Sequence, residues 1–275
     1  GLGVAYVVVT RLSADLPDVA GLATYEVPQT SRIFARDGQV VATLFIENRT
    51  KVPLDQMSPY LVKALLAVED SRFYGHSGVD WVGVGRAAIA NVLFRGIDQG
   101  ASTLTMQLAR NRFLNQDQTL ARKIREIVLA LRIEKKYSKE KILEYYLNNV
   151  YFGSGAYGVA AASSLYFGDT PDKLSIAQAA LIAGLVQAPS SLSPLVDRDA
   201  SVERMKIVLG RMRDTQLITQ EQYDQEVSRG EAFRFGKGTP TARSSSEQLL
   251  KYPYFTTYVI AELADRYQTL RREIL

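Results

Sequence analysis

Polar side chains and glycines are concentrated in two neighbouring stretches of the chain, residues 69–78 and residues 100–107. The second stretch is followed closely by Arg110. Together they supply acid, hydroxyl, amide and guanidinium groups, which can bind a substrate that carries both sugar hydroxyls and phosphate. A protein that only packs helices together does not need such a concentration. We therefore expect a binding or catalytic site in this part of the chain.

Glu69 is the first candidate for acid–base chemistry. The apolar residues before it have helical spacing and place it at a helix end, beside Asp70. Two adjacent carboxylates repel each other, which favours proton uptake by the less solvated one and suits a general acid or base. An exposed acidic helix end explains the pair more simply, and these two residues alone favour that simpler interpretation.

Glu126 is a second candidate because it lies among the cations Arg122, Lys123 and Arg125. It follows Arg122 by four residues, so the two can form an ordinary ion pair on a helix surface, worth a few tenths of a kcal/mol. Alternatively, the carboxylate is held ionised to bind a metal while the cations neutralise phosphate. Without further context the surface ion pair is favoured.

Hydroxyl and amide groups in the second stretch suit phosphate or sugar binding. Ser102, Thr103 and Gln107 can donate hydrogen bonds to such a ligand, and Arg110 can pair with phosphate in a bidentate way. Ser102 or Thr103 could also be a helix N-cap, and both roles are compatible. His76 is the one histidine of the chain, and we interpret it as a structural hydrogen-bonding residue.

The elements that must position these residues are predicted to be mainly helices. Ser58 as N-cap and Pro59 at the first position indicate the start of a helix that ends at Glu69. Further helices are expected over 119–136, from Ser138 onward, and over 159–166, 175–187, 200–213 and 219–229. Two short strands around Asp37-Gly38 indicate a β-hairpin. The apolar residues 79–98 favour a core helix or a membrane-leaning surface.

Composition excludes several classes of site. The chain has 275 residues, a formal net charge of +4 and no cysteine, so disulfides, thiol catalysis and cysteine-bound zinc are excluded. A single histidine argues against a multi-histidine metal site and a Ser-His triad. The match of Ser138 and Lys141 to a Ser-x-x-Lys motif is a chance match at a charged helix start.

Individually weak, these signals together resemble the peptidoglycan glycosyltransferase domain (glycosyltransferase family 51) of class A penicillin-binding proteins and of their monofunctional relatives. The resemblance covers about residues 28–215. It rests on five motifs, made up of Glu69, Asp70, Phe73, His76 and Gly78; Gly100, Ser102, Thr103, Thr105 and Gln107; Arg122, Lys123 and Glu126; Tyr151, Phe152, Gly153, Gly155, Tyr157 and Gly158; and Ala183, Gly184, Leu185 and Pro189.

The resemblance implies a mainly α fold. A lysozyme-like helical lobe would carry a small membrane-facing jaw lobe, with a short N-terminal β-hairpin before them. Residues 79–98 would belong to the jaw. We expect a lead-in and hairpin over 13–57, the glycosyltransferase domain over 58–232, and over 233–275 a linker towards a transpeptidase domain that this chain lacks, so that it has no transpeptidase activity. Residues 1–12 are the remnant of a membrane anchor or an edge strand.

The resemblance also implies a reaction. A glycan on a polyprenyl pyrophosphate is the donor, lipid II is the acceptor, and Glu69 removes the proton of the acceptor 4-hydroxyl for an inverting attack. Glu126 would bind a divalent cation, Mg²⁺ or Mn²⁺, that stabilises the leaving pyrophosphate. The predicted substrate-binding residues are Asp70, Phe73, Arg86, Ser102, Thr103, Gln107, Arg110, Arg122, Lys123 and Arg125. Met106 departs from the family pattern, which often has a second Gln there.

The expected partners follow from the same resemblance. They are lipid II, the lipid-linked glycan, the membrane surface, moenomycin-type inhibitors and a cell-wall synthesis complex, with no nucleic acid. The protein would be anchored by one span in the bacterial cytoplasmic membrane, with this domain on the extracytoplasmic face. The main alternative is a lytic glycosidase acting on peptidoglycan, which has no need for a Glu126 surrounded by cations. A non-catalytic membrane or nucleic-acid binder would not need Glu69.

Overall fold

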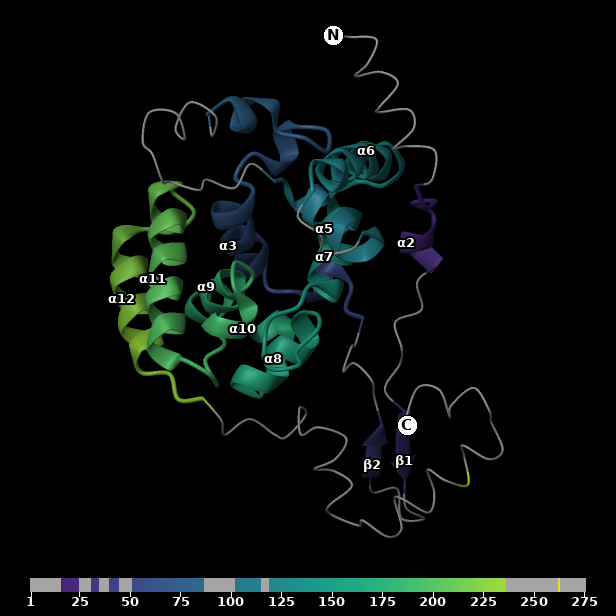
Figure 1. Cartoon of the computed structure of the whole chain (residues 1–275). Helices are drawn as coiled ribbons and strands as arrows, with labels where there is room; N and C mark the ends of the chain where they lie inside the picture. The colour runs from purple at the N-terminus through teal and green to yellow at the C-terminus, as the bar shows by residue number, and fades with distance from the viewer. Residues whose placement is uncertain are drawn as a thin grey trace, which may run out of the picture.

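A computed structural model of the chain describes residues 16–24, 31–34, 40–44, 51–86, 102–114, 119–235 and 262. This part of the chain is mainly helical, as predicted (Figure 1). Its helices are α2 (Gly21–Thr24), α3 (Pro59–Glu69), α5 (Leu104–Phe113), α6 (Leu120–Lys136), α7 (Lys139–Asn149), α8 (Val159–Phe167), α9 (Ile176–Leu185), α10 (Pro189–Leu192), α11 (Arg198–Asp214) and α12 (Gln220–Glu231).

Shorter elements complete the described chain. Strands β1 (Ser31–Phe34) and β2 (Val40–Leu44) pair in antiparallel fashion, with a register irregularity between Ile33 and Phe34. Three short 3₁₀ turns are η1 (Leu54–Gln56), η2 (Phe73–Gly75) and η3 (Pro171–Lys173). Residues 81–86 are also helical. The main chain of Gly83 donates to Oδ1 of Asp80 at 2.9 Å, so Asp80 caps this segment.

Capping residues explain most of the helix starts. The side chain of Thr119 accepts from the backbone N–H of Arg122 before α6, and Ser138 accepts from Lys141 before α7. Ser138 is therefore the N-cap of α7. This role explains why a serine stands there, so its match to the Ser-x-x-Lys motif needs no catalytic explanation. Ser58 is different, because it precedes α3 as predicted but its hydroxyl donates to the carbonyl of Leu174 at 2.9 Å and makes no cap hydrogen bond.

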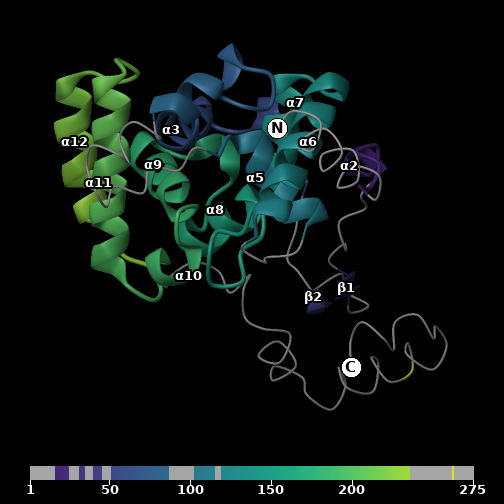
Figure 2. The same ribbon diagram turned by 45° about the horizontal axis from the view of Figure 1, so that its top comes forward.

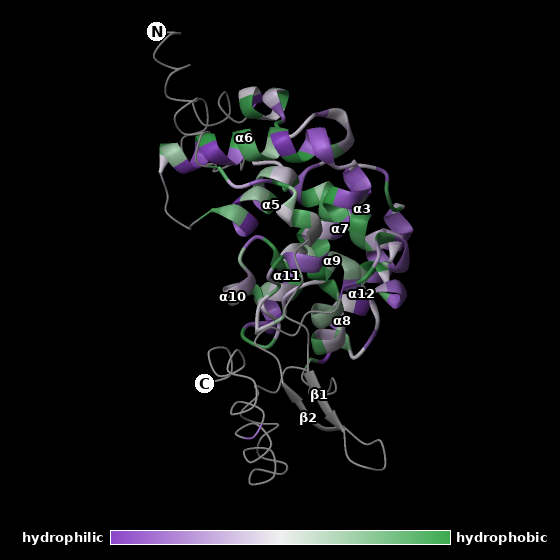
Figure 3. Cartoon of the chain, turned by 90° about the vertical axis from the view of Figure 1, so that its right-hand side faces the viewer, coloured by the Kyte–Doolittle hydropathy of each residue, from purple (hydrophilic) through white to green (hydrophobic). Residues whose placement is uncertain are grey.

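The main core is built around α9. Residues 176–185 are all buried except Gln178, and the helix packs against α3, α8 and α11. Many of its side chains are alanine, so neighbouring helices can approach closely. Figure 2 shows α11 and α12 side by side along one flank of the molecule. In Figure 3 the ribbon of α6 alternates between hydrophobic and hydrophilic bands, as expected of a helix that buries one face.

A second, smaller apolar cluster lies between the first polar stretch, α5 and α6. Val79, Met106 and Ala130 are buried in it, with Val84 and Ile127 packed against them. Met106 thus fills an apolar position where a glutamine would bury an amide, which is why the family departure is tolerated here. The division into a lysozyme-like lobe and a jaw stays a prediction.

Several predictions fall on residues outside the described ranges. They concern the proposed anchor remnant over 1–12, the Asp37-Gly38 turn, the part of the apolar stretch beyond residue 86, and most of the 233–275 linker. Within the described residues no helix is long and apolar enough to cross a bilayer.

Candidate active site

Glu69 is the last residue of α3, and its carboxylate accepts a hydrogen bond from a residue on the first turn of α5. The helix ends there because Asp70, at φ −157° and ψ 70°, leaves the helical conformation, while its N–H still donates to the carbonyl of Leu66. Nε2 of Gln107 donates to Oε2 of Glu69 at 2.9 Å. The predicted base and a predicted substrate-binding residue are therefore in direct contact, with Gln107 on the first turn of α5.

Tyr146 on α7 completes this hydrogen-bonded group. Its hydroxyl donates to Oε1 of Gln107 at 2.7 Å, so both ends of the amide are paired. The side chain is only 1% exposed. Burial raises the pKa of Tyr146 well above its ordinary value of 10.0; the charge of Glu69 raises it further and that of Arg110 opposes the change. The phenol is therefore neutral and acts as a hydrogen-bond donor.

Asp70 joins the first polar stretch to the second. Its buried carboxylate accepts from the backbone N–H of Leu104 at 3.0 Å and lies 3.1 Å from Nε2 of His76. Thr103 makes a parallel connection, because its hydroxyl donates to the carbonyl of Gly78 at 2.6 Å and accepts from the N–H of Met106. Thr103 is thus the N-cap of α5, and His76 has the structural role we expected. Direct contacts of Asp70 and Thr103 with substrate stay predictions.

Phe73, a predicted substrate-binding residue, is buried after the end of α3. Its ring is 1% exposed, packs edge-on against Tyr74 and His76, and is covered by Nζ of Lys139 at 4.3 Å from the ring centre. The structure therefore gives Phe73 a packing role, and a direct contact of Phe73 with substrate stays a prediction. A fully buried ring in this position holds the turn after α3 against α7.

Glu126 is a buried carboxylate, in contrast to the surface ion pair that spacing alone favoured. It is 0% exposed, with Oε2 3.1 Å from Nζ of Lys123 and Oε1 3.1 Å from Nε of Arg122, the latter at ion-pair distance but outside hydrogen-bond alignment. Nζ of Lys123 also lies 2.5 Å from the hydroxyl of Ser102. Because a buried charge must be paired, Glu126 fixes these cations in place.

The two carboxylates are connected through the N-terminal end of α5. Lys123, which is paired with Glu126, contacts Ser102 just before the helix. Glu69 contacts Gln107 on the first turn of the helix. Gln107 follows the N-cap by four residues, which is about one turn and roughly 6 Å along the axis. The carboxylate of Glu69 and the cations around Glu126 therefore lie on either side of the N-terminus of α5. The positive end of the helix dipole at that point also attracts an anion.

The other predicted cations are less closely tied to this group. Arg110 lies on α5, one turn beyond Gln107, and its charge acts on Tyr146. Arg86 is exposed at the end of the 81–86 segment, and Arg125 is half-buried on α6. In the part of the chain that the structure describes, neither Arg86 nor Arg125 forms an ion pair with Glu126. Their part in substrate binding stays a prediction.

Arg204 is a cation whose charge interacts with that of Glu69 and that was not among the predicted site residues. It lies on α11, donates to the carbonyl of Gly184 at 3.4 Å, and is half-buried. Burial lowers the pKa of Arg204, the negative charge of Glu69 partly offsets this, and Arg211 acts in the direction of burial. Arg204 therefore adds positive potential on the side of Glu69. Tyr146 was also missed; the signal for it is that a buried phenol needs a partner.

The predicted divalent metal fits this arrangement poorly. Both oxygens of Glu126 face cationic side chains, which would repel a further cation. Over the residues that the structure describes, no group of three or more acidic or histidine side chains is placed to hold a metal. A divalent metal at Glu126 stays a prediction.

The site can now be compared with known proteins. Residues 37–213 match the family model described as Transglycosylase, and this range includes every described part of the site. The chain belongs to the transglycosylase family. This transglycosylase is 44% identical over 267 residues to penicillin-binding protein 1A of Escherichia coli (strain K12), covering 97% of this chain and 30% of the relative.

Other relatives agree with this membership. The transglycosylase is 39% identical over 255 residues to penicillin-binding protein 2D of Bacillus subtilis (strain 168), covering 92% of this chain and 36% of that relative. The chain thus spans about a third of the length of these two relatives. Neither relative is named as a lytic glycosidase, so these matches do not favour that alternative.

A solved structure supports the fold. The crystal structure of penicillin-binding protein 1A from Haemophilus influenzae matches the transglycosylase with a TM-score of 0.51 and 26% identity. The match covers 88% of this chain and 25% of that structure. The mainly helical architecture inferred from the sequence therefore has a counterpart in this crystal structure.

Proposed function

We propose that this transglycosylase is a peptidoglycan glycosyltransferase that polymerises lipid II into glycan strands and releases polyprenyl pyrophosphate. One observation carries the proposal. Glu69 and the Lys123–Glu126 ion pair are both hydrogen-bonded to the N-terminal end of α5. Sugar transfer from a diphosphate needs both a base and positive charge within one substrate length. A lytic glycosidase has no diphosphate to stabilise, so it does not account for the cation group.

In the proposed reaction Glu69 is the base. Its carboxylate takes the proton of the acceptor 4-hydroxyl as that oxygen forms a bond to the anomeric carbon of the donor. The bond between the anomeric carbon and the phosphate oxygen breaks, and its electron pair leaves with the polyprenyl pyrophosphate. Attack opposite to the leaving group inverts the anomeric configuration. A base positioned in this way typically contributes ~10²–10⁴-fold to the rate.

Cations are proposed to receive the departing diphosphate. Lys123 and Arg122 are held by the buried carboxylate of Glu126, so they are oriented before the substrate binds. Ser102 and the N-terminal end of α5 lie beside Lys123 and supply further donors. Arg86, Arg110 and Arg125 are proposed to extend this positive surface towards the pyrophosphate.

The lipid part of the substrate is proposed to reach the site from a membrane surface. Trp81 and Leu120 are 64% and 86% exposed although both are large and apolar. Such side chains suit the interface of a bilayer, with Arg86 at headgroup level. We propose lipid II, the lipid-linked glycan and the membrane surface as partners, moenomycin-type inhibitors as ligands, and a cell-wall synthesis complex as the assembly. We further propose that the protein is anchored by one span in the bacterial cytoplasmic membrane, with this domain outside.

The deciding experiment is incubation of the chain with lipid II and Mg²⁺ in detergent, followed by electrophoresis of the products. We expect polymeric glycan from the wild type and a loss of at least about 10²-fold in Glu69→Gln. Glu221→Gln, a change of an exposed acid in α12, is the control and should retain full activity. Shortening of preformed glycan with no polymer would support the glycosidase instead, and full activity in Glu69→Gln would remove the proposed base.

A further inference from the structure

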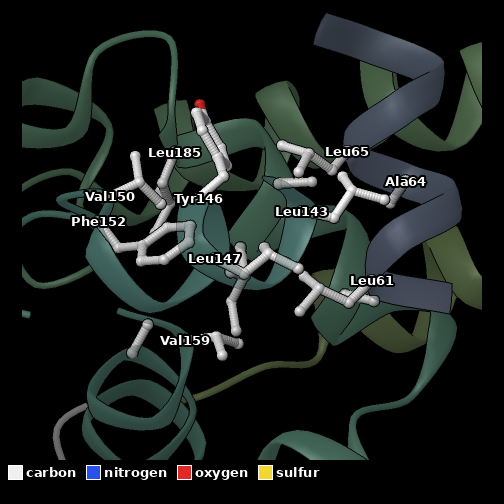
Figure 4. Packing of buried hydrophobic residues seen from close by; sticks show 14 of the residues in the cluster. Leu61, Ala64, Leu65, Leu143, Tyr146, Leu147, Val150, Phe152, Val159 and Leu185 are labelled. Carbon is white, nitrogen blue, oxygen red and sulfur yellow. The ribbon is translucent and has the colours of Figure 1, made fainter. Parts of the chain in front are cut away.

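Tyr146 is placed with unusual rigidity for a residue that reaches the site. Figure 4 shows its ring among the buried side chains of Leu143, Val150 and Leu185, with the hydroxyl oxygen projecting away from them. The hydroxyl lies 2.7 Å from Oε1 of Gln107. A ring packed on all sides cannot follow a movement of its partner. Tyr146 therefore presents one donor at a fixed point in space.

The amide of Gln107 has two different ends, and its orientation decides what Glu69 meets. In the structure Nε2 donates to Glu69 while Oε1 accepts from Tyr146. If the amide were reversed, its oxygen would face the carboxylate, and the two could share a hydrogen bond only if Glu69 were protonated. The hydroxyl proton of Tyr146 would then lose the acceptor that it has in the structure. The observed orientation satisfies all three groups when Glu69 is ionised.

We propose that Tyr146 is a positioning residue for the base: it selects the orientation of the Gln107 amide and so keeps Glu69 ionised and aimed between substrate-binding events. The inference rests on the proposed function, because it assigns Glu69 as the base. Tyr146 acts through the side chain of Gln107, and in this proposal it contacts neither the donor sugar nor the acceptor sugar. The hydroxyl, separated from Glu69 by one amide, thus influences the protonation of a carboxylate that it does not contact.

Removal of the hydroxyl tests the idea with little change in packing. In Tyr146→Phe the ring remains, but Oε1 of Gln107 loses its donor and the reversed amide becomes competitive. The reversed amide pairs with protonated Glu69, so the acid limb of the pH–rate profile should move to higher pH by about one unit. Below that limb kcat should fall roughly tenfold, with KM for lipid II little changed, since one hydrogen bond to the base is redirected.

Two further variants separate positioning from a general loss of structure. Tyr166→Phe is the matched control, because Tyr166 is also fully buried and its hydroxyl donates to the carbonyl of Phe152, away from Glu69. It should lose similar stability and keep the wild-type pH profile. Gln107→Leu removes the intermediary, so Tyr146→Phe added to Gln107→Leu should cause no further shift of the acid limb.

The outcomes are distinct. Inactivity of the wild type towards lipid II would refute the proposed function, and with it the positioning role, because Glu69 would then not be the base of this reaction. An active wild type whose pH profile is unchanged by Tyr146→Phe would overturn the positioning role while leaving the function intact. An equal shift in Tyr166→Phe, or additive effects in the double variant, would also overturn it, because either result indicates a non-specific loss of stability.

Discussion

Nζ of Lys123 lies 2.5 Å from the hydroxyl of Ser102, and this contact joins α6 to the residues just before α5. The same ammonium group is 3.1 Å from Oε2 of Glu126. One lysine therefore connects a buried carboxylate to the helix start where Gln107 holds Glu69. A substitution at Glu126 should therefore alter the proposed donor site through Lys123, although Glu126 does not contact that site directly.

The first prediction concerns Glu126→Gln. The neutral amide no longer fixes Lys123 and Arg122, so we expect kcat/KM for lipid II to fall on the order of 10²-fold. If Glu126 acts by holding the cations, the Mg²⁺ concentration that gives half-maximal activity should stay unchanged. Steady-state polymerisation rates over a Mg²⁺ titration measure both quantities.

Glu134→Gln is the matched control for that prediction. Glu134 lies on the same helix, has a side chain that is only 6% exposed, and accepts from Thr105 and Lys139. This variant should lose stability and keep most of its activity per folded molecule. A large increase in the Mg²⁺ requirement of Glu126→Gln alone would instead assign Glu126 to a metal and would contradict the role we give it.

The second prediction concerns the turn before α8. Gly158 has φ +79°, and a Cβ atom there would lie 2.6 Å from the carbonyl oxygen of Asn148. Its N–H also donates to the carbonyl of Val150 at 2.9 Å, so the turn cannot easily shift. Gly158→Ala should lower the free energy of unfolding by at least about 2 kcal/mol, as measured by chemical denaturation.

Gly210 provides the comparison for that measurement. It lies inside α11, and a Cβ there would meet no atom within 4 Å. Gly210→Ala should therefore raise the free energy of unfolding by about 0.5–1 kcal/mol, since alanine loses less backbone entropy in a helix. Equal effects of the two substitutions would mean that the close approach at Gly158 is relieved at little cost.

The third prediction concerns stability at alkaline pH. Burial raises the pKa of Tyr146 above the ordinary value of 10.0, and burial also raises the pKa of Tyr166. An acid whose pKa is raised by folding stabilises the folded state below the unfolded pKa, and this stability is lost as the pH rises through the folded pKa. The wild type should therefore lose stability as the pH rises above about 10.

Tyr146→Phe isolates the contribution of one of these groups. It should be less stable than the wild type at pH ~8, because a hydrogen bond is missing. Its stability should then fall less steeply between pH ~10 and ~11, because one fewer group titrates differently in the two states. Denaturation curves at these pH values make the comparison, and parallel curves for the two proteins would show that Tyr146 does not contribute.

Local sequence rules predicted the helices well. The starts of α6 and α7 follow from Thr119 and Ser138, whose side chains bond within three residues along the chain. Ser58 shows where such rules stop: the helix begins after it as predicted, but its hydroxyl bonds to Leu174 instead, 116 residues away. A short-range preference loses when packing offers a buried acceptor.

Burial was the property that the sequence left open. The spacing of Arg122 and Glu126 fits an exposed ion pair, but α6 packs against α5 and covers the carboxylate completely. Phe73 belongs to a motif of the resemblance and was assigned to substrate binding, although its ring is enclosed by Tyr74, His76 and Lys139. Motif membership does not distinguish a residue that touches substrate from one that supports the fold.

The sequence by itself determined the helical class, most helix starts and the family, because these depend on residue types and on spacings of a few positions. Only the tertiary structure decided the pairings. Gln107 meets Glu69 and Tyr146 across 38 and 39 residues, and Lys123 meets Ser102 across 21. Contacts of that range arise when packed helices bring side chains together, and interactions between residues three or four apart cannot specify them.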